Sequence, residues 1–382
     1  TQIMLQQRHY KRLFSFLALA YNQKYTIKSH SAVFVTGFSP PITASAASYC
    51  LSTTSSTLRR NMLSNDAVEE PEELSPSKKP PTLLVHGLDS SSHTWRGVLK
   101  KMSSSGLTAV AIDQRGCGKS PLGDPDRFSP DLLVDDLYST VSSDPLFRSN
   151  DESGGATIKP FVLVGHSMGG RLAMSFAVRY PELIAALVIE DMDIRTRPLS
   201  ESRIQSKDRD ATLAFDRKLT GTPEKIIEAF EREGYPKEMV ESWFDEGRIS
   251  KFEEEGNDNN SYYYSQVNPA FRLLCYEQFF ETNHGEDTWK KLAGIVRNDQ
   301  QRRFPIHLMI ADPEMTICDK ESVSTMKDAM DELSSSTSAA SPLTIHRYAG
   351  ATHSIHNSLP EAFAADLEAI IENASAKTTT EK

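Results

Sequence analysis

This chain of 382 residues is short of cysteine, of long apolar runs and, over its first 65 residues, of acidic side chains. Its four cysteines match no metal-binding spacing, and a chain this long needs no disulfide framework, so we expect reduced, structural thiols. No apolar run approaches the roughly 20 residues of a membrane-spanning helix, which argues against stable membrane insertion. The overall composition, with 38% hydrophobic and 25% charged residues, is ordinary for a globular protein.

The acid-free segment, residues 1–65, carries seven Lys and Arg residues and is rich in Ser, Thr and Ala. This composition is typical of a transit peptide, for the mitochondrion first and the plastid second. The apolar run Leu13–Ala20, followed by small residues near Ala44, leaves a secretory-type signal as an alternative, and a disordered tail without an address as another. We predict a targeting or disordered segment over 1–65 and a proline-rich linker over 66–80.

Charge is unevenly divided along the chain, whose formal net charge is −10. Beyond residue 65 the chain has 35 basic against 52 acidic residues. A body this acidic is a poor partner for nucleic acid or for an anionic membrane, so we expect a small-molecule partner.

From residue 81 onward, short apolar runs alternate with helical patterns. The predicted strands are Thr82–Val85, Thr108–Ile112, Phe161–Val164, Leu183–Ile189, Pro305–Ile310 and Leu343–Tyr348. The predicted helices are Trp95–Met102, Pro130–Val141, Gly170–Tyr180, Lys320–Leu333 and Pro360–Glu372. This order predicts an α/β fold, a mostly parallel sheet covered by helices on both faces.

The alternation breaks at 195–292, which is charged, helix-periodic and poor in strands. We predict a helical cap there, in which Ser261–Tyr264 forms a strand or a lid hinge. The core is then built from 81–194 and 293–382. An insertion at this point lies over the carboxyl ends of the strands, where α/β folds bind ligands.

The most informative motif is Gly165-His166-Ser167-Met168-Gly169, placed between a buried-strand pattern and a helix pattern. A serine on a tight strand-to-helix turn needs small neighbours, and such a turn exposes its hydroxyl above the sheet. The motif predicts Ser167 as a nucleophile.

A serine nucleophile needs a base, and the base needs an acid that orients it. His353 follows the last predicted strand and precedes the last helix, and it comes earlier in that loop than His356. We therefore predict His353 as the base. The acid is either Asp191, after the strand that follows the motif, or a residue of the next strand end, Asp312 or Glu314.

Two acids beside the first candidate, Glu190 and Asp193, read as ordinary surface residues. The developing oxyanion needs two backbone donors. Met168 follows the nucleophile and supplies one, and Leu88, in the loop after the first strand, supplies the other. The set requires no metal or organic cofactor.

Together these segments resemble the α/β-hydrolase superfamily over roughly Pro81 to Glu372. The resemblance is carried by His86-Gly87, Asp113 to Ser120, Gly165 to Gly170 and the late histidine loop. Gly165 to Asp191, Tyr264 to Asn268 and Thr352 to His356 further resemble the esterase branch typified by α/β-hydrolase domain-containing protein eleven and its bacterial relatives. In bacterial members of that branch the acid follows the strand after the motif's helix, which favours Asp191.

The expected function is that of a serine hydrolase acting on carboxylic esters or thioesters. Epoxide hydrolases and haloalkane dehalogenases of this fold carry aspartate at the motif, so Ser167 argues against those reactions. An acyltransferase or a cofactor-free haloperoxidase would use the same three residues. A non-catalytic binding protein on a hydrolase scaffold is the alternative from another class.

Overall fold

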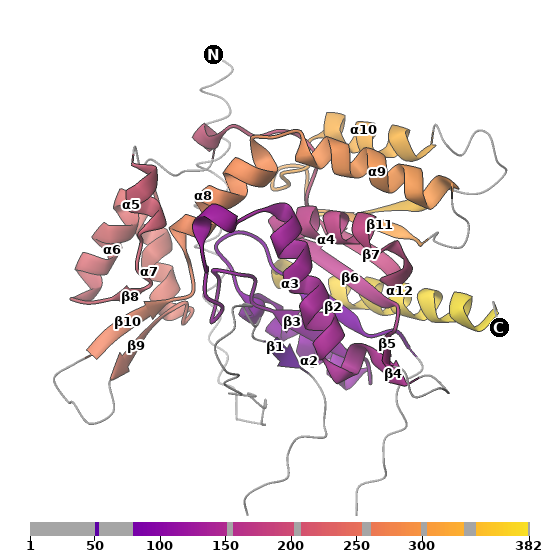
Figure 1. The fold of residues 1–382 in the computed structure, drawn as a ribbon, viewed down its shortest axis with the longest axis horizontal. Coiled ribbons are helices and arrows are strands. Elements are labelled where there is room, and N and C mark those ends of the chain that lie inside the picture. Colours follow the sequence, from indigo (N-terminus) through magenta and orange to yellow (C-terminus); the bar gives the residue numbers. More distant parts are fainter. Residues whose placement is uncertain are drawn as a thin grey trace, which may run out of the picture.

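The computed structural model describes residues 50–52, 79–150, 156–201, 208–253, 261–298, 304–331 and 341–380 (Figure 1). A central sheet has the strand order β1-β3-β2-β6-β7-β11-β12, in which the last six strands are mutually parallel and β1 is antiparallel to β3. Its strands are β1 (Cys50–Ser52), β2 (Thr82–Val85), β3 (Ala109–Ile112), β6 (Phe161–His166), β7 (Ile184–Glu190), β11 (Ile306–Ile310) and β12 (Leu343–Arg347). The six strands predicted from apolar runs all form, and the prediction of an α/β fold is confirmed.

Helices cover both faces of this sheet (Figure 1). They are α2 (Arg96–Ser104), α3 (Pro130–Ser143), α4 (Met168–Arg179), α9 (His284–Asn298), α10 (Lys320–Asp331), α11 (Ile355–Ser358) and α12 (Pro360–Thr380). Strands β4 (Arg148–Asn150) and β5 (Ala156–Ile158) form a separate two-stranded antiparallel sheet.

The central strands β2, β3, β6 and β7 are mostly apolar because both of their faces are buried. In β2, Leu83 and Val85 point into one core and Leu84 into the other, and all three are fully buried. The first core lies under α3, α4, α9 and α10, and the second lies under α2, α11 and α12. The sheet is therefore held from both sides, and its carboxyl edge is a rigid base for loops.

Helix α3 shows how local signals set an element. Ser129 caps its N-terminus by accepting a hydrogen bond from the Leu132 backbone N–H, and Pro130 occupies the first turn, where its missing N–H costs nothing. Leu133 and Val134 lie in the core, whereas Leu132 is only half-buried.

The segment predicted as a helical cap contains a sheet as well as helices, which corrects the prediction. Three helices, α5 (Arg209–Leu213), α6 (Pro223–Arg232) and α7 (Lys237–Asp245), lie beside an antiparallel sheet of β8 (Lys218–Leu219), β9 (Ile249–Glu253) and β10 (Ser261–Ser265). The tyrosine run of β10 favours a strand. Its partner β9 has charged, exposed residues and therefore shows no apolar pattern in the sequence. Helices α6 and α7 and the three strands share a core of their own around Phe230 and Trp243, whereas Leu213 of α5 packs against the main core.

The predicted cap boundary at residue 292 also differs from the packing. Helix α8 (Pro269–Cys275), the π-helical turn that continues it (Tyr276–Phe280) and α9 contribute apolar side chains to the same core as α4. The chain therefore returns to the main body at about Pro269. The part with a separate core, which we call the cap, comprises 215–253 and 261–267.

The expectation that residues 1–65 lie entirely outside the fold is wrong for three of them. Cys50–Ser52 form β1, the antiparallel edge strand on β3. A three-residue strand is too short to show a periodic pattern, and its hydrogen bonding with β3 defines it. The rest of the predicted leader, and the linker before Lys79, lie outside the described residues.

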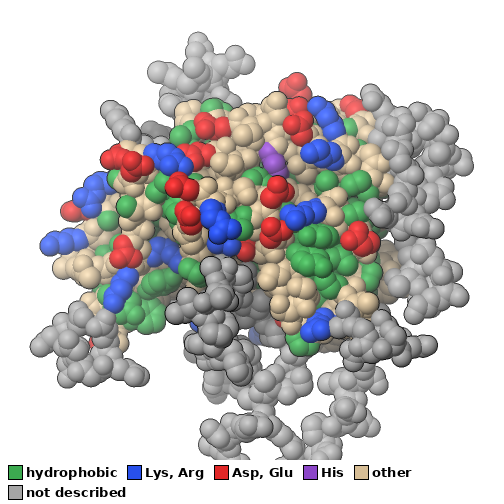
Figure 2. Space-filling view, viewed as in Figure 1, with side chains coloured by type: hydrophobic (Ala, Val, Ile, Leu, Met, Phe, Trp, Pro, Cys, Tyr) green, Lys and Arg blue, Asp and Glu red, His purple; other side chains and the backbone are tan. Residues whose placement is uncertain are grey.

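On the face drawn in Figure 2, acidic and basic side chains lie interspersed over the cap and the main body. No helix in the described part of the chain has the length and apolar character to cross a membrane.

Candidate active site

Ser167 stands at the turn between β6 and α4, with φ 53° and ψ −126°. Its backbone N–H donates to the Glu190 carbonyl at 2.9 Å, and its carbonyl accepts from the Gly170 N–H at 2.7 Å. Such a φ is costly for a residue with a Cβ, and it survives because strand and helix pin the residue from both sides. The side chain is 8% exposed at the carboxyl edge of the sheet.

The small neighbours predicted for this turn are required by close backbone packing. A Cβ on Gly169 would lie 2.5 Å from the His86 carbonyl oxygen, and one on Gly165 would lie 2.3 Å from the Gly169 carbonyl oxygen. A Cβ on Gly87 would lie 2.8 Å from the Ser167 Cβ. The loop after β2 therefore touches the serine, as the expected position of Leu88 requires.

His353 Nδ1 donates to Asp191 Oδ2 at 2.7 Å. Asp191 is fully buried, and its oxygens accept from three more donors, the backbone N–H groups of Ala311 and Ile317 and the hydroxyl of Thr316. The carboxylate is thus immobile. Because Nδ1 carries the proton, Nε2 of the half-buried His353 keeps its lone pair.

The alternative acids at the end of β11 do not approach His353. Asp312 accepts from the backbone N–H groups of Gly350 and Glu314, and these two hydrogen bonds lower its pKa. Glu314 is exposed. Asp312 therefore braces the loop that leads to His353, and Asp191 is the carboxylate that contacts the imidazole.

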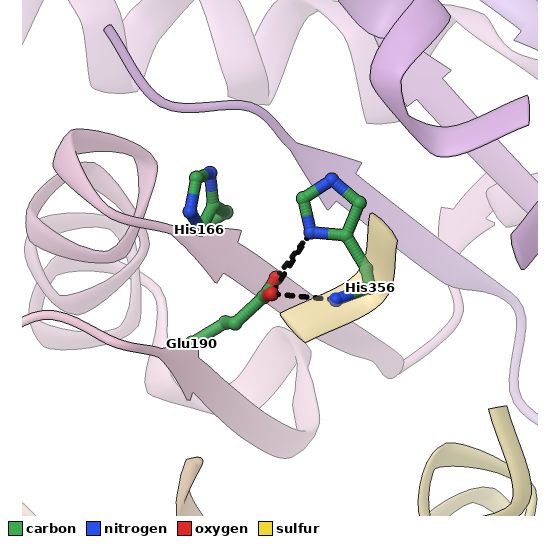
Figure 3. Close-up of side chains that lie close together, drawn as sticks. All are labelled: His166, Glu190 and His356. Atoms are coloured by element: carbon green, nitrogen blue, oxygen red, sulfur yellow. Dashed lines mark hydrogen bonds and ion pairs between the residues drawn. The ribbon is translucent and has the colours of Figure 1, made fainter. Parts of the chain in front are cut away.

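His356, the alternative base, is a buried partner of Glu190 (Figure 3). Its Nδ1 lies 2.8 Å from both Glu190 oxygens, its backbone N–H donates to Oε1 at 2.9 Å, and its ring stacks on Trp95 with centroids 4.1 Å apart. Its Nε2 accepts from Thr94 Oγ1 at 2.8 Å. With both nitrogens engaged, His356 anchors the histidine loop to the sheet.

The expectation that Glu190 and Asp193 are ordinary surface acids is wrong, since both are fully buried. Asp193 pairs with Arg197 at 2.8 Å and with Arg195 at 3.2 Å. The sequence did carry a signal for Glu190, because it ends a strand whose neighbouring loop holds a second histidine.

His166 completes a group with Glu190 and His356 whose potential ligand atoms lie within 4.8 Å of one another. A metal would have to displace existing bonds, since His356 donors already occupy both carboxylate oxygens. Figure 3 shows the His166 ring standing apart from that pair. The contacts are those of a hydrogen-bonded pair beside a third, neutral ring.

The neutrality of His166 follows from its surroundings. Burial first, and then the neighbouring His353 and His356, hold its pKa well below the usual 6.5. Its Nε2 donates to the His353 carbonyl at 3.1 Å. His166 therefore fixes the backbone of His353.

The loop after β2 is set by His86, whose pKa is lowered mainly by burial. Nδ1 donates to the Gly87 carbonyl at 2.7 Å, and Nε2 accepts from the Gln114 backbone N–H at 3.2 Å. These bonds select one neutral tautomer and hold the loop beside Ser167.

Comparison with known proteins matches residues 82–366 to the family described as the alpha/beta hydrolase family. The chain belongs to the alpha/beta hydrolase family. Among solved structures, the chain superposes on a marine microorganism esterase with a TM-score of 0.51 and 17% identity, over 76% of this chain and 95% of that one. It superposes on a peroxisomal alpha-beta-hydrolase of Saccharomyces cerevisiae with a TM-score of 0.50 and 14% identity, over 79% of each chain. These likenesses show the fold.

Sequence matches to characterised relatives are local. The chain is 34% identical over 113 residues to the sn-1-specific diacylglycerol lipase ABHD11 of Danio rerio, which is 29% of this chain and 31% of the lipase. It is 33% identical over 115 residues to epoxide hydrolase 3 of Xenopus tropicalis, which is 29% of this chain and 27% of that protein. The matched regions thus span about a third of the length of these relatives.

Proposed function

We propose that this hydrolase cleaves carboxylic esters or thioesters through an acyl-enzyme on Ser167. The observation that carries the proposal is the hydrogen bond of 2.7 Å between His353 and the buried Asp191, whose carboxylate also accepts three other hydrogen bonds. His166, the residue before Ser167, contacts the backbone carbonyl of the same histidine at 3.1 Å, which links the pair to the end of β6 that carries the serine. An immobile carboxylate that sets the tautomer of a half-exposed histidine is what a serine nucleophile requires.

In the proposed reaction, Ser167 Oγ attacks the acyl carbon and its proton passes to His353 Nε2. The tetrahedral oxyanion faces the backbone N–H groups of Met168 and Leu88. His353 then gives its proton to the leaving alkoxide or thiolate, and the carbon–oxygen or carbon–sulfur bond breaks. Water repeats the sequence: His353 takes its proton, the hydroxide adds to the acyl carbon, and the acid leaves as Ser167 is protonated again.

The similar relatives bear the names of a lipase, an epoxide hydrolase and a probable alcohol acetyltransferase, so their names alone do not choose a reaction. Residue 167 does favour one class, because a serine forms an acyl-enzyme from an ester. Transfer of that acyl group to an alcohol instead of water is the second candidate, and it uses the same residues. We also propose that the cap shapes the acyl pocket.

The test is a panel of acyl esters and thioesters of graded chain length, together with a fluorophosphonate probe, on wild type and Ser167→Ala. Wild type should label and turn over, and S167A should lose labelling and several orders of magnitude in rate while its circular dichroism stays unchanged. Adding an alcohol acceptor separates hydrolysis from acyl transfer. Wild-type activity in S167A would overturn the serine mechanism.

A further inference from the structure

Asp89 follows Leu88 in the loop after β2 and has φ 52°, in the left-handed region. A non-glycine residue adopts this conformation when its surroundings hold it there. Asp89 has a single peptide unit between it and the N–H proposed to bind the oxyanion. A change in the backbone conformation of Asp89 therefore reorients the neighbouring Leu88 N–H.

Three side chains from outside the loop hold Asp89. Tyr235 donates its hydroxyl to Oδ1 at 2.9 Å, and Arg248 donates to the backbone carbonyl at 2.8 Å. Arg272, on α8, donates through Nε to Oδ1 at 3.1 Å and through Nη2 to Oδ2. The Asp89 and Arg272 side chains are only 12% and 11% exposed, so this pairing is poorly screened by water.

Two of these partners belong to the cap. The Tyr235 ring packs edge-on against Phe230 and Trp243 in the cap core, with centroids 5.7 and 5.2 Å apart. Arg248 lies between α7 and β9. A movement of the cap as a body would therefore pull directly on Asp89.

We propose that Asp89 is a positioning residue through which the cap sets the oxyanion donor Leu88. With the cap in place, Tyr235, Arg248 and Arg272 hold Asp89 in its left-handed conformation, and the Leu88 N–H faces the reacting oxygen. With the cap displaced, the loop relaxes and that donor is lost. The inference rests on the proposed function, because it assigns a role in the same reaction.

Asp136 provides a matched control. It pairs with Arg115 through two hydrogen bonds of 2.7 and 2.8 Å, and the two side chains are 13% and 9% exposed. The pair of Asp136 and Arg115 thus resembles the pair of Asp89 and Arg272 in side-chain types and burial, but Asp136 lies on α3. Asp136→Asn should cost stability without touching the oxyanion loop.

The experiment compares wild type, D89N, Y235F and D136N in kcat, KM, fluorophosphonate labelling rate and hydrogen exchange over 86–91. In D89N the amide NH₂ group replaces one carboxylate oxygen. In either orientation it faces a donor, either Tyr235 with Arg272 Nε or Arg272 Nη2, so at least one hydrogen bond is lost. We expect D89N to lower kcat and labelling rate by about tenfold to a hundredfold, less than full loss of an oxyanion donor, with little change in KM. Exchange over 86–91 should rise.

Y235F removes one cap bond and should shift the same quantities in the same direction by less, so it carries the test if D89N does not fold. D136N should lower stability by breaking the buried pair with Arg115, but it should stay within about twofold of wild-type kcat, because Asp136 contacts neither the oxyanion loop nor a residue of the proposed reaction. Equal kcat in D89N and D136N, or faster exchange in D89N with unchanged kcat, would overturn the proposal. If wild type neither labels nor hydrolyses, the proposed function fails, and exchange over 86–91 then decides by itself whether Asp89 holds the loop.

Discussion

Asp89, Ser167 and Asp191 are the non-glycine residues with positive φ in the described parts of the chain, and all three lie at the carboxyl edge of the sheet. Each such conformation costs of order 1–3 kcal/mol and persists only where neighbours impose it. Strain is thus concentrated in the three loops that carry the proposed chemistry. The rest of the described backbone avoids it.

Ser167→Gly should be more stable than Ser167→Ala. Both lose the hydroxyl, but glycine alone adopts φ 53° without a steric penalty. We expect a gain of about 1 kcal/mol, which is about 1–2 °C in melting temperature for a chain of this length. Thermal melts of the two inactive variants provide the comparison, and equal melting temperatures would show that the turn is unstrained.

Asp191→Asn should lower kcat by roughly a thousandfold or more, because an amide no longer selects the histidine tautomer that leaves Nε2 free. Steady-state kinetics on the best ester of the panel measure this change. Asp312→Asn is the control, since Asp312 only braces the neighbouring loop. A larger loss in D312N than in D191N would overturn the assignment of the acid.

At the scale of elements, the histidine loop is anchored between the end of β7 and the segment before α2. Glu190 holds His356 from the strand, and Thr94 holds the same ring from the other side. His166 fixes the His353 carbonyl from β6. His353 therefore sits on a loop with three separate attachments, none of which uses its imidazole ring.

Glu190→Gln should loosen that loop. One of the two carboxylate oxygens that His356 Nδ1 contacts becomes a donor, and a buried donor left unpaired costs about 1–3 kcal/mol. Urea titration should show this loss, with a parallel fall in kcat and little change in KM. If stability falls and kcat does not, the Glu190–His356 pair serves folding only.

For the whole molecule, buried neutral histidines predict a pH dependence of stability. Burial, with nearby Arg171 and Lys291, lowers the pKa of His284 to about 4, whereas the unfolded side chain titrates near 6.5. Between these values the unfolded chain binds the proton and the folded one does not, so stability falls as pH drops from 6.5 to 4. His86 and His166 act in the same direction.

Melting temperatures of wild type and His284→Gln from pH 7.5 to 4 test this prediction. The variant should show a shallower fall over the window because one of the titrating groups is gone. Parallel curves would mean that His284 is already protonated in the folded state, or is not held from water.

We propose that the acid-free N-terminal segment directs import into an organelle, the mitochondrion first and the plastid second. Because Cys50–Ser52 pair with β3, the fusion should end at residue 49. Residues 1–49 fused to a fluorescent protein should reach the organelle, and fluorescence microscopy with organelle markers measures this. A diffuse signal would contradict the proposal.

Truncation provides the companion measurement. A chain beginning at residue 50 keeps β1 and should keep its melting temperature, whereas one beginning at residue 66 loses that edge strand and should melt lower. Equal melting temperatures would show that β1 contributes nothing to the fold.

The sequence by itself determined the alternation of strands and helices, the turn at Ser167 and the loop position of His353. These depend on local signals, namely apolar runs, glycines at close contacts and chain order. It did not decide between Asp191 and Asp312, because neighbouring parallel strands end at the same edge of the sheet. It also missed β1, the sheet of the cap and the burial of Glu190 and Asp193.

Only the tertiary structure settled those points. A three-residue edge strand or a charged strand has no pattern of its own and exists through its partner. The burial of an acid depends on donors from distant segments, as His356 and Arg197 show for Glu190 and Asp193. Contacts such as that of Asp89 with Tyr235 and Arg272 join residues more than 140 positions apart, and no local pattern encodes them.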